Sequence, residues 1–155
     1  MKILHKESEI LEYLKKESLG ILATLEPNSE NIRLRVMYYG IDDEFNCYLM
    51  STKGSPKIKQ VLSSSKVSFI IFTIEDPYDE SWEIEIDGTA ELLKKKKEIN
   101  FSMEKLKGKN PFADVALESG IIEQFDFVKL IPEIVRFRVY REALNGNPPS
   151  ILYFK

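Results

Sequence analysis

The sequence contains one cysteine, Cys47, and one histidine, His5, among its 155 residues. A single thiol cannot form an internal disulfide, and one cysteine with one histidine is too few for a structural zinc site. The one histidine, His5, lies far from Cys47 in sequence, and no other histidine is present to activate Cys47 as a hydrolytic nucleophile. The scarcity of both residues therefore excludes three common sources of structure or catalysis.

Long apolar runs and a strong excess of one charge are also missing. The apolar stretch at 67–72 is interrupted by a serine and is far shorter than the roughly 20 residues of a membrane-spanning helix. Residues 1–7 carry no apolar run of signal-peptide length. The net charge of −3 argues against a general nucleic-acid binder. We therefore expect a cytoplasmic protein with neither a membrane nor a nucleic acid as its partner.

The composition is that of one globular domain over residues 1–155. Hydrophobic residues make up 43% and charged residues 30%, so the chain can bury a sizeable core. Residue periodicity predicts strands at 19–25, 32–39, 45–50, 66–74, 82–92 and 128–140, and helices capped by Ser8, starting at Ser55-Pro56, and covering 94–107 and 113–122. Six strands linked mostly by hairpins predict a mainly β fold with flanking helices, closed as a six-stranded antiparallel barrel.

Two arginines share one face of the predicted strand 32–39. Apolar residues at 32, 34, 36 and 38 form one row, while Arg33 and Arg35 lie with Met37 and Tyr39 on the other. Guanidinium groups about 7 Å apart along a strand can bind phosphate bidentately. The alternative is a solvated exterior face of the barrel.

Residues 51–57 place hydroxyl groups, a glycine and a lysine at the start of a helix. The amide groups and partial positive charge of a helix N-terminus suit an anion. Ser55 would be either the helix cap or a direct phosphate donor, and Lys57 adds a charge. A simple strand-to-helix junction remains the alternative, and the Walker spacing is absent.

Two other charged segments favour ordinary solvated surfaces. Residues 94–109 hold seven lysines and two glutamates, but lack the repeated alternation of basic and aromatic residues that would indicate a nucleic-acid patch. The acids at 83, 85, 87 and 91 alternate along one strand, which is more typical of an exposed face than of a metal or acid–base site.

Several segments together resemble a known family. They are 20–25, 35–37, 48–57, 66–69 and 86–92, and their order and spacing are similar to those of the pyridoxamine 5′-phosphate oxidase-like, FMN-binding split-barrel superfamily. The resemblance implies a six-stranded split barrel that forms a homodimer, with one FMN in each of two clefts between the subunits.

The resemblance also implies a set of cofactor-binding residues, and no metal. Arg35, Val36 and Met37 would line the flavin strand, and Ser51 and Thr52 would lie near the phosphate or ribityl chain. Ser55 and Lys57 would hold the phosphate at the helix start. Glu83 stands where the oxidase has an amide side chain near the flavin. No catalytic residue is implied.

The function implied is an FMN-dependent oxidoreductase that acts on a small molecule. The ending at 148–155 lacks the arginine-proline pair that helps the oxidase bind its phosphorylated pyridine, so that substrate is not assigned. The apolar tail at 151–154 is expected to contribute to a dimer contact. The alternatives are a non-catalytic flavin-binding or stress-related protein, and a relative that uses deazaflavin or haem. Because His5 lies outside the barrel pattern, haem would need a tyrosine or methionine ligand.

Overall fold

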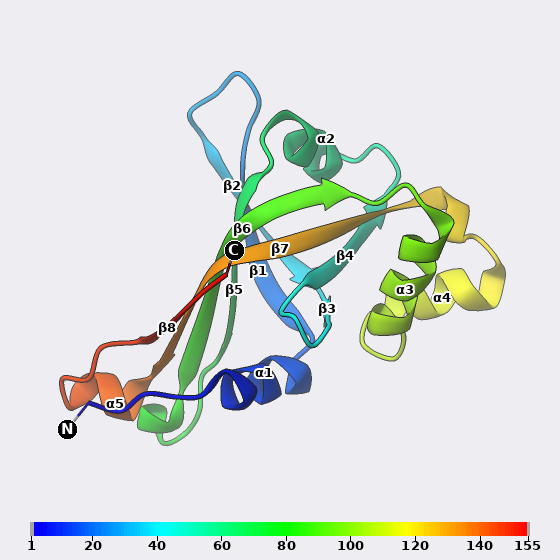
Figure 1. The fold of residues 1–155 in the computed structure, drawn as a ribbon. Helices are drawn as coiled ribbons and strands as arrows, with labels where there is room; N and C mark the ends of the chain where they lie inside the picture. Colours follow the sequence, from blue (N-terminus) through cyan, green and yellow to red (C-terminus); the bar gives the residue numbers. More distant parts are fainter. Residues whose placement is uncertain (1, 155) are drawn as a thin grey trace.

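A computed structural model describes residues 2–154 as one curled antiparallel sheet with flanking helices (Figure 1). The strands are β1 (Leu19–Leu25), β2 (Ile32–Tyr38), β3 (Gly40–Ile41), β4 (Cys47–Thr52), β5 (Lys66–Thr73), β6 (Trp82–Leu92), β7 (Phe125–Val139) and β8 (Ser150–Tyr153). The helices are α1 (Glu7–Lys16), α2 (Pro56–Ser63), α3 (Lys96–Leu106), α4 (Pro111–Ser119) and α5 (Tyr140–Leu144), with short 3₁₀ turns η1 (Tyr78–Glu80) and η2 (Ile122–Gln124). The predicted mainly β split barrel is confirmed, with two short strands, β3 and β8, beside the six longer ones.

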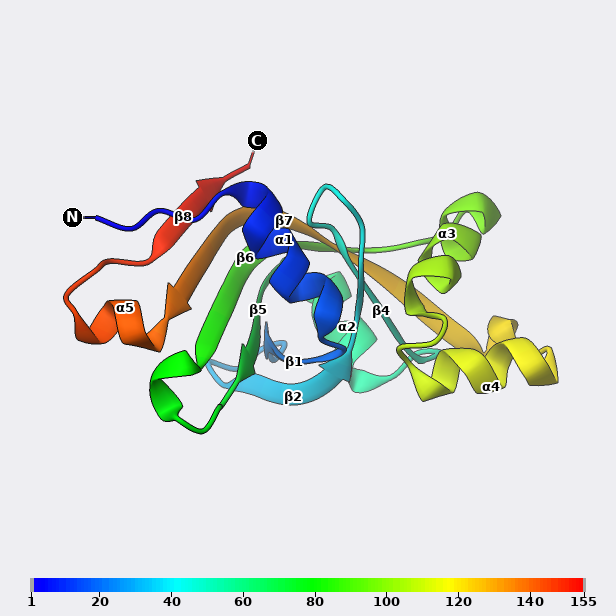
Figure 2. The same cartoon turned by 90° about the horizontal axis from the view of Figure 1, so that it is seen from below.

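The sheet curls along the order β2-β1-β5-β6-β7-β4-β3, with β8 added to β7. Figure 2 shows the curl, which brings β2 and β4 towards each other. Within residues 2–154, no ladder joins β2 to β4, so the barrel is split there and β2 is an edge strand. The long β7 pairs with β4 through its first half and with β8 through its second half.

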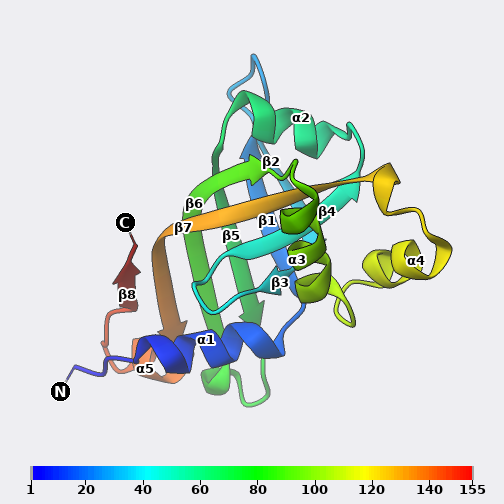
Figure 3. The ribbon, with the colours of Figure 1, turned by 45° about the vertical axis from the view of Figure 1, so that its right-hand side comes forward.

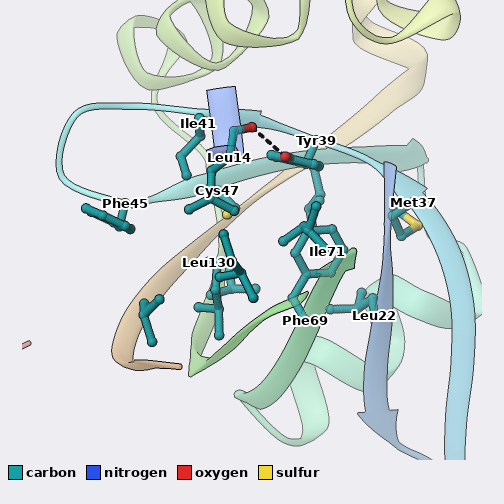
Figure 4. Packing of buried hydrophobic residues seen from close by; sticks show 14 of the residues in the cluster. Leu14, Leu22, Met37, Tyr39, Ile41, Phe45, Cys47, Phe69, Ile71 and Leu130 are labelled. Atoms are coloured by element: carbon teal, nitrogen blue, oxygen red, sulfur yellow. Dashed lines mark hydrogen bonds between the residues drawn. The ribbon is translucent and has the colours of Figure 1, made fainter. Parts of the chain in front are cut away.

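The core lies on the concave side of the sheet, where the alternating residues of β6 are buried as the sequence predicts. Trp82, Ile84 and Ile86 point inward, while the acids between them point outward. Tyr39 is fully buried and its hydroxyl donates a hydrogen bond to the Leu14 carbonyl oxygen of α1, at 2.5 Å (Figure 4). The helix is thereby fixed to the barrel through a polar contact inside an apolar core.

One glycine makes the bend of the β6–β7 pair possible. Gly88 points inward, and a Cβ atom there would lie 2.1 Å from the Ile131 carbonyl oxygen. The register shifts between Asp87 and Gly88, opposite Pro132, which has no amide proton for a ladder bond. The long hairpin therefore bends at a bulge that leaves no room for a side chain.

The helices close the barrel at its ends and side. α1 and α2 lie at opposite ends of the barrel, and α3 and α4 lie beside it (Figures 1 and 3). Ser8 is not the cap of α1, since Lys6 holds that position without a side-chain cap bond. α4 begins two residues earlier than predicted, because the Asn110 side chain accepts a hydrogen bond from the Phe112 amide at 2.8 Å.

The C-terminal tail is a strand, not a loose apolar segment. β8 pairs with the second half of β7, and Leu152 and Phe154 pack against the core. The Phe154 ring lies 5.3 Å from that of Phe45, whereas Tyr153 is 76% exposed. Two of the four residues expected to form a dimer contact, Leu152 and Phe154, therefore pack within their own chain.

Candidate functional site

Arg35 lies where β2, β1 and α2 meet. One guanidinium nitrogen donates to the Thr24 hydroxyl at 2.7 Å, and the other donates to the Gln60 side-chain oxygen at 2.6 Å. The Thr24 hydroxyl donates to the same Gln60 oxygen at 2.6 Å. Thr24 and Gln60 are buried, whereas Arg33 on the same strand face is exposed. Of the two arginines, only Arg35 belongs to a built polar cluster.

The half-buried Arg35 has no acidic counterpart. Within residues 2–154, no carboxylate lies within 4 Å of its guanidinium group. Burial lowers the pKa of Arg35, and the nearby charge of Arg33 lowers it further. A partly desolvated cation held only by neutral oxygen atoms retains unbalanced positive charge, which favours an external anion.

The N-terminus of α2, the helix whose Gln60 side chain binds Arg35, has no side-chain cap bond. Ser55 holds the N-cap position, but its side chain makes no cap bond. The Ser55 and Ser51 hydroxyl oxygens are instead 2.8 Å apart, which joins the helix start to the end of β4. Ser55 therefore occupies the predicted N-cap position without a side-chain cap bond, and the first amide groups of α2 have no side-chain acceptor.

Lys57 completes this neighbourhood from the first turn of α2. It is partly buried and precedes Gln60 by three residues, so the two side chains are neighbours on the helix surface. Lys57, Met37 and Ser51 line one small cavity of about 10 Å³ between the barrel wall and α2. We call Arg35, Ser51, Ser55 and Lys57 the anion cluster.

Four predicted residues lie outside the anion cluster, and one of them, Met37, is buried and lines the small cavity beside it. Thr52 is exposed at the end of β4. Val36 points to the convex face of the sheet and is 66% exposed. Glu83 also points to the convex face, where its carboxylate accepts a hydrogen bond from Arg138 at 2.9 Å. The predicted residues therefore do not form one group, since Val36 and Glu83 lie on the outer face and Thr52 at a strand end.

The apolar row of β2 lies on this outer face and not in the core. Ile32, Leu34 and Val36 are 64–66% exposed, while Met37 on the opposite row is buried. The alternative placement of Arg35 on a solvated exterior is therefore wrong. Residue alternation identifies which side chains share a face, but both faces of β2 carry apolar residues, so the pattern alone does not identify the buried one.

The outer face has an apolar half and a charged half. One cross-strand row runs through Val36, Ile21, Ile70, Glu85 and Arg136. β2, β1 and β5 supply the apolar side chains, and β6 and β7 supply ion pairs. Arg136 lies 2.7 Å from the Asp87 carboxylate, which has a lowered pKa because this hydrogen bond and one from Ser68 outweigh the opposing effect of burial.

Glu83, Glu85 and Asp87 of β6 are thus explained as partners of β7 arginines, whereas Glu91 is exposed opposite Lys129. Within residues 2–154, no three side chains of the His, Cys, Asp and Glu types are grouped so as to hold a metal ion.

None of the described helices combines the length and apolar character that crossing a bilayer requires.

Sequence reasoning missed Thr24 and Gln60. The available signal was Gln60 itself, a polar residue between Ile58 and Val61 on the apolar side of a short helix. A buried amide needs a partner, and the partner lies on another strand. That pairing depends on how α2 covers the barrel end, which periodicity does not give.

The chain has clear relatives by family model and by fold. A family model described as pyridoxamine 5′-phosphate oxidase matches residues 7–138. No curated protein sequence matches the chain.

Three solved structures show the extent of the fold likeness. A conserved hypothetical protein of Mycobacterium tuberculosis, Rv2991, is 21% identical with a TM-score of 0.75, covering 95% of this chain and 91% of that one. A heme binding protein of Mycobacterium smegmatis is 16% identical with a TM-score of 0.71, covering 97% of this chain and 59% of that one. A FAD-binding protein of Mesorhizobium loti is 16% identical with a TM-score of 0.65, covering 86% and 94%. At these identities the likeness establishes the fold alone.

Proposed function

Because the chain belongs to the pyridoxamine 5′-phosphate oxidase family, we propose that it binds FMN and that the anion cluster holds the phosphate of the cofactor. The observation that carries this proposal is the half-buried Arg35, which donates to Gln60 of α2, a helix whose start has no side-chain cap, and has no carboxylate partner in the described chain. These groups suit a phosphate dianion, so the residues present fit the cofactor.

Each member of the cluster has a separate role. Arg35 supplies a planar guanidinium that Thr24 and Gln60 hold in place. Lys57 supplies a second positive charge, and the Ser51 and Ser55 hydroxyl groups can donate to phosphate oxygens. Charge-assisted hydrogen bonds of this type contribute about 1.5–3 kcal/mol each. The cluster therefore favours FMN over riboflavin, which has no phosphate.

The edge of β2 is the natural place for the ring system. Among the described residues β2 pairs only with β1, so the backbone groups along its other edge point into the split of the barrel. A flat heterocycle with donors and acceptors on its rim can use such an edge. Arg35 stands on this strand, so a ring bound there would lie next to a positive charge.

We also propose that the protein is a homodimer in which the apolar half of the outer face is covered by a second copy. One group of exposed apolar side chains is contiguous across the adjacent strands β2, β1 and β5, where it includes Ile32, Leu34, Val36, Leu19, Leu25 and Phe72. Contiguous patches of this kind indicate contact surfaces. Val36 and Glu83 lie on this outer face, so they would approach a flavin only if it were bound between two copies.

The activity we propose is an FMN-dependent oxidoreduction of a small molecule. The bound flavin would supply hydride or electron transfer. The residues of the chain would bind and orient it, hold positive charge beside it through Arg35, and exclude water through the covering copy. No side chain is assigned as a covalent catalyst. A non-catalytic flavin-binding role uses the same site and differs only in turnover.

The absorbance spectrum of the purified protein tests this proposal. We expect an oxidised flavin spectrum, and release of the cofactor by denaturation should yield FMN. A haem or deazaflavin spectrum would contradict the proposal. Oxidation of NAD(P)H by the loaded protein would then separate an oxidoreductase from a flavin-binding protein without turnover.

A further inference from the structure

A second candidate site lies away from the anion cluster. A pocket of about 620 Å³ opens between the start of α3, the turn η2 and the first residues of β7. Its volume is in the range of small-molecule sites, about 300–1,000 Å³. In Figure 1 these segments lie to the right of the barrel, near the point where β6 leads into α3.

The floor of the pocket is apolar and held by the backbone. Leu93 and Phe127 are 6% and 1% exposed, and the Leu93 amide donates to the Phe127 carbonyl oxygen at 2.8 Å. Ile99, Ile122 and Phe125 also line the pocket and pack against the smaller of the two core clusters. The floor is therefore a preformed apolar surface.

The rim of the pocket is positively charged. Lys53, Lys94 and Lys96 line it, whereas the neighbouring Lys95 and Lys97 do not. Within residues 2–154, none of the three lining lysines has a carboxylate within 4 Å. The lysine run is thus split, with alternate residues facing the pocket and the solvent.

Two further features set the balance of charge. α3 begins at Lys96 without a side-chain cap, so its free amide groups add positive potential at the same rim. Two acids, Glu123 and Asp126, also line the pocket. Asp126 accepts a hydrogen bond from the Gly54 amide at 2.9 Å, which uses one of its oxygens. Three lysines against two acids leave a net positive rim.

We propose that this pocket binds a small amphipathic anion, with an apolar body on the Leu93–Phe127 floor and a carboxylate at the lysine rim. The pocket is separate from the anion cluster, since none of the cluster residues lines it. The inference does not depend on flavin binding.

Titration with 2-naphthoate, followed by NMR of the backbone amides, tests the proposal. The neutral 2-naphthylmethanol is the matched ligand. We expect naphthoate to shift the Leu93, Ile99, Gly120 and Phe127 amide signals and to bind more tightly than the alcohol. Lys94→Gln with Lys96→Gln should weaken naphthoate at least about fivefold, the scale of one exposed charge contact, and leave the alcohol unchanged.

The control variant is Lys95→Gln with Lys97→Gln, which removes the same charge from the same run but not from the pocket. It should bind naphthoate almost as tightly as the wild type. If both variants bound naphthoate equally weakly, the loss would come from the general surface charge and not from the pocket, and the proposal would be overturned. Absence of binding, shifts centred elsewhere, or displacement of naphthoate by FMN would also overturn it.

Discussion

At the scale of single residues, Arg35 shows how one side chain combines a structural and a binding role. Its hydrogen bonds to Thr24 and Gln60 join two strands to α2. The same neutral partners leave its charge unbalanced. A purely structural arginine at this depth would be expected to have a carboxylate partner, as Arg136 and Arg138 do on the outer face.

Replacement of Arg35 by alanine should therefore affect both properties. Loss of its two hydrogen bonds should lower the free energy of unfolding by about 1–3 kcal/mol, and FMN affinity should fall at least tenfold, as expected for one charge-assisted contact of about 1.5 kcal/mol or more. Arg33→Ala is the matched control, because Arg33 is exposed on the same strand face. Denaturant unfolding and flavin titration of both variants give the comparison. Similar flavin affinities in the two variants would remove Arg35 from the phosphate site.

His5 makes long-range contacts that no sequence pattern predicts. Its ring bonds to Glu142 at 2.8 Å and to Glu9 at 3.1 Å, and its amide donates to the Ser150 hydroxyl at 3.0 Å. Its ring edge also meets the Phe137 ring. Glu142 lies 137 positions away in sequence. The ring thus links the N-terminal segment to the C-terminal part of the fold.

This contact predicts a pH-dependent contribution to stability. Burial lowers the pKa of His5, but the hydrogen bonds to Glu142 and Glu9 outweigh it, so the net pKa is raised above 6.5. A raised folded-state pKa means that the stabilisation is complete below the unfolded pKa and is lost as pH rises through the folded value. His5→Gln should flatten this pH dependence in urea unfolding across the neutral range. An unchanged profile in the variant would exclude His5 as its source.

At the scale of elements, the bend of the β6–β7 hairpin depends on a close backbone approach. The alternation of β6 correctly predicts its bounds and its buried face. The alternation does not predict the bulge, because Gly88 lies on the inward row as any small residue could. The bulge becomes evident only when the pairing places Pro132 of β7 opposite Gly88.

Gly88→Ala should accordingly destabilise the protein. The added methyl group would lie 2.1 Å from a backbone oxygen, which cannot move aside as a flexible side chain would. We expect a loss of about 1–3 kcal/mol in thermal or denaturant unfolding, typical of overpacking. Ala90→Gly, on the same inward row, adds no atoms and should cost about 1 kcal/mol or less. A Gly88→Ala protein as stable as the wild type would contradict the close approach.

The helices and the tail show where prediction from sequence fails at this scale. The start of α2 and both ends of α3 are predicted within two residues, because a proline marks the first and Gly108 follows the last. β8 was missed because a four-residue strand after Pro148-Pro149 has no internal periodicity. Such a strand forms because the second half of β7 offers it a ladder partner.

At the scale of the whole molecule, the apolar outer face is the feature that a single chain leaves unexplained. Its residues come from β2, β1 and β5, and Leu34 and Val36 are among the most exposed. The ion pairs of β6 and β7 border it. An apolar centre beside a charged border is typical of a protein–protein interface.

Leu34→Glu combined with Val36→Glu should therefore yield a monomer. Two buried carboxylates at a covered interface would oppose association strongly, while both positions are exposed within one chain, so folding should persist. Light scattering and circular dichroism measure the two properties. Leu144→Glu, on exposed α5, should remain dimeric. A wild-type protein that is monomeric by light scattering and still binds FMN tightly would contradict the arrangement.

The sequence predicts the barrel and names the four residues of the proposed anion cluster because both depend on local patterns. Strand alternation, the proline at the start of α2 and the order of short segments are all readable along the chain. The partners of Arg35, the pairing of Glu83 with Arg138 and the exposure of Val36 are not. They depend on which face of the sheet curls inward, and this is decided by contacts between segments far apart in sequence.

The most direct test of the phosphate site is a comparison of FMN and riboflavin binding to the flavin-free protein, followed by flavin fluorescence. We predict that FMN binds at least about 100-fold more tightly, since two charge-assisted contacts contribute about 3 kcal/mol or more. Lys57→Ala should weaken FMN by about 1.5–3 kcal/mol and leave riboflavin unchanged. Equal affinities of the wild-type protein for FMN and riboflavin would contradict the assignment of the anion cluster as a phosphate site.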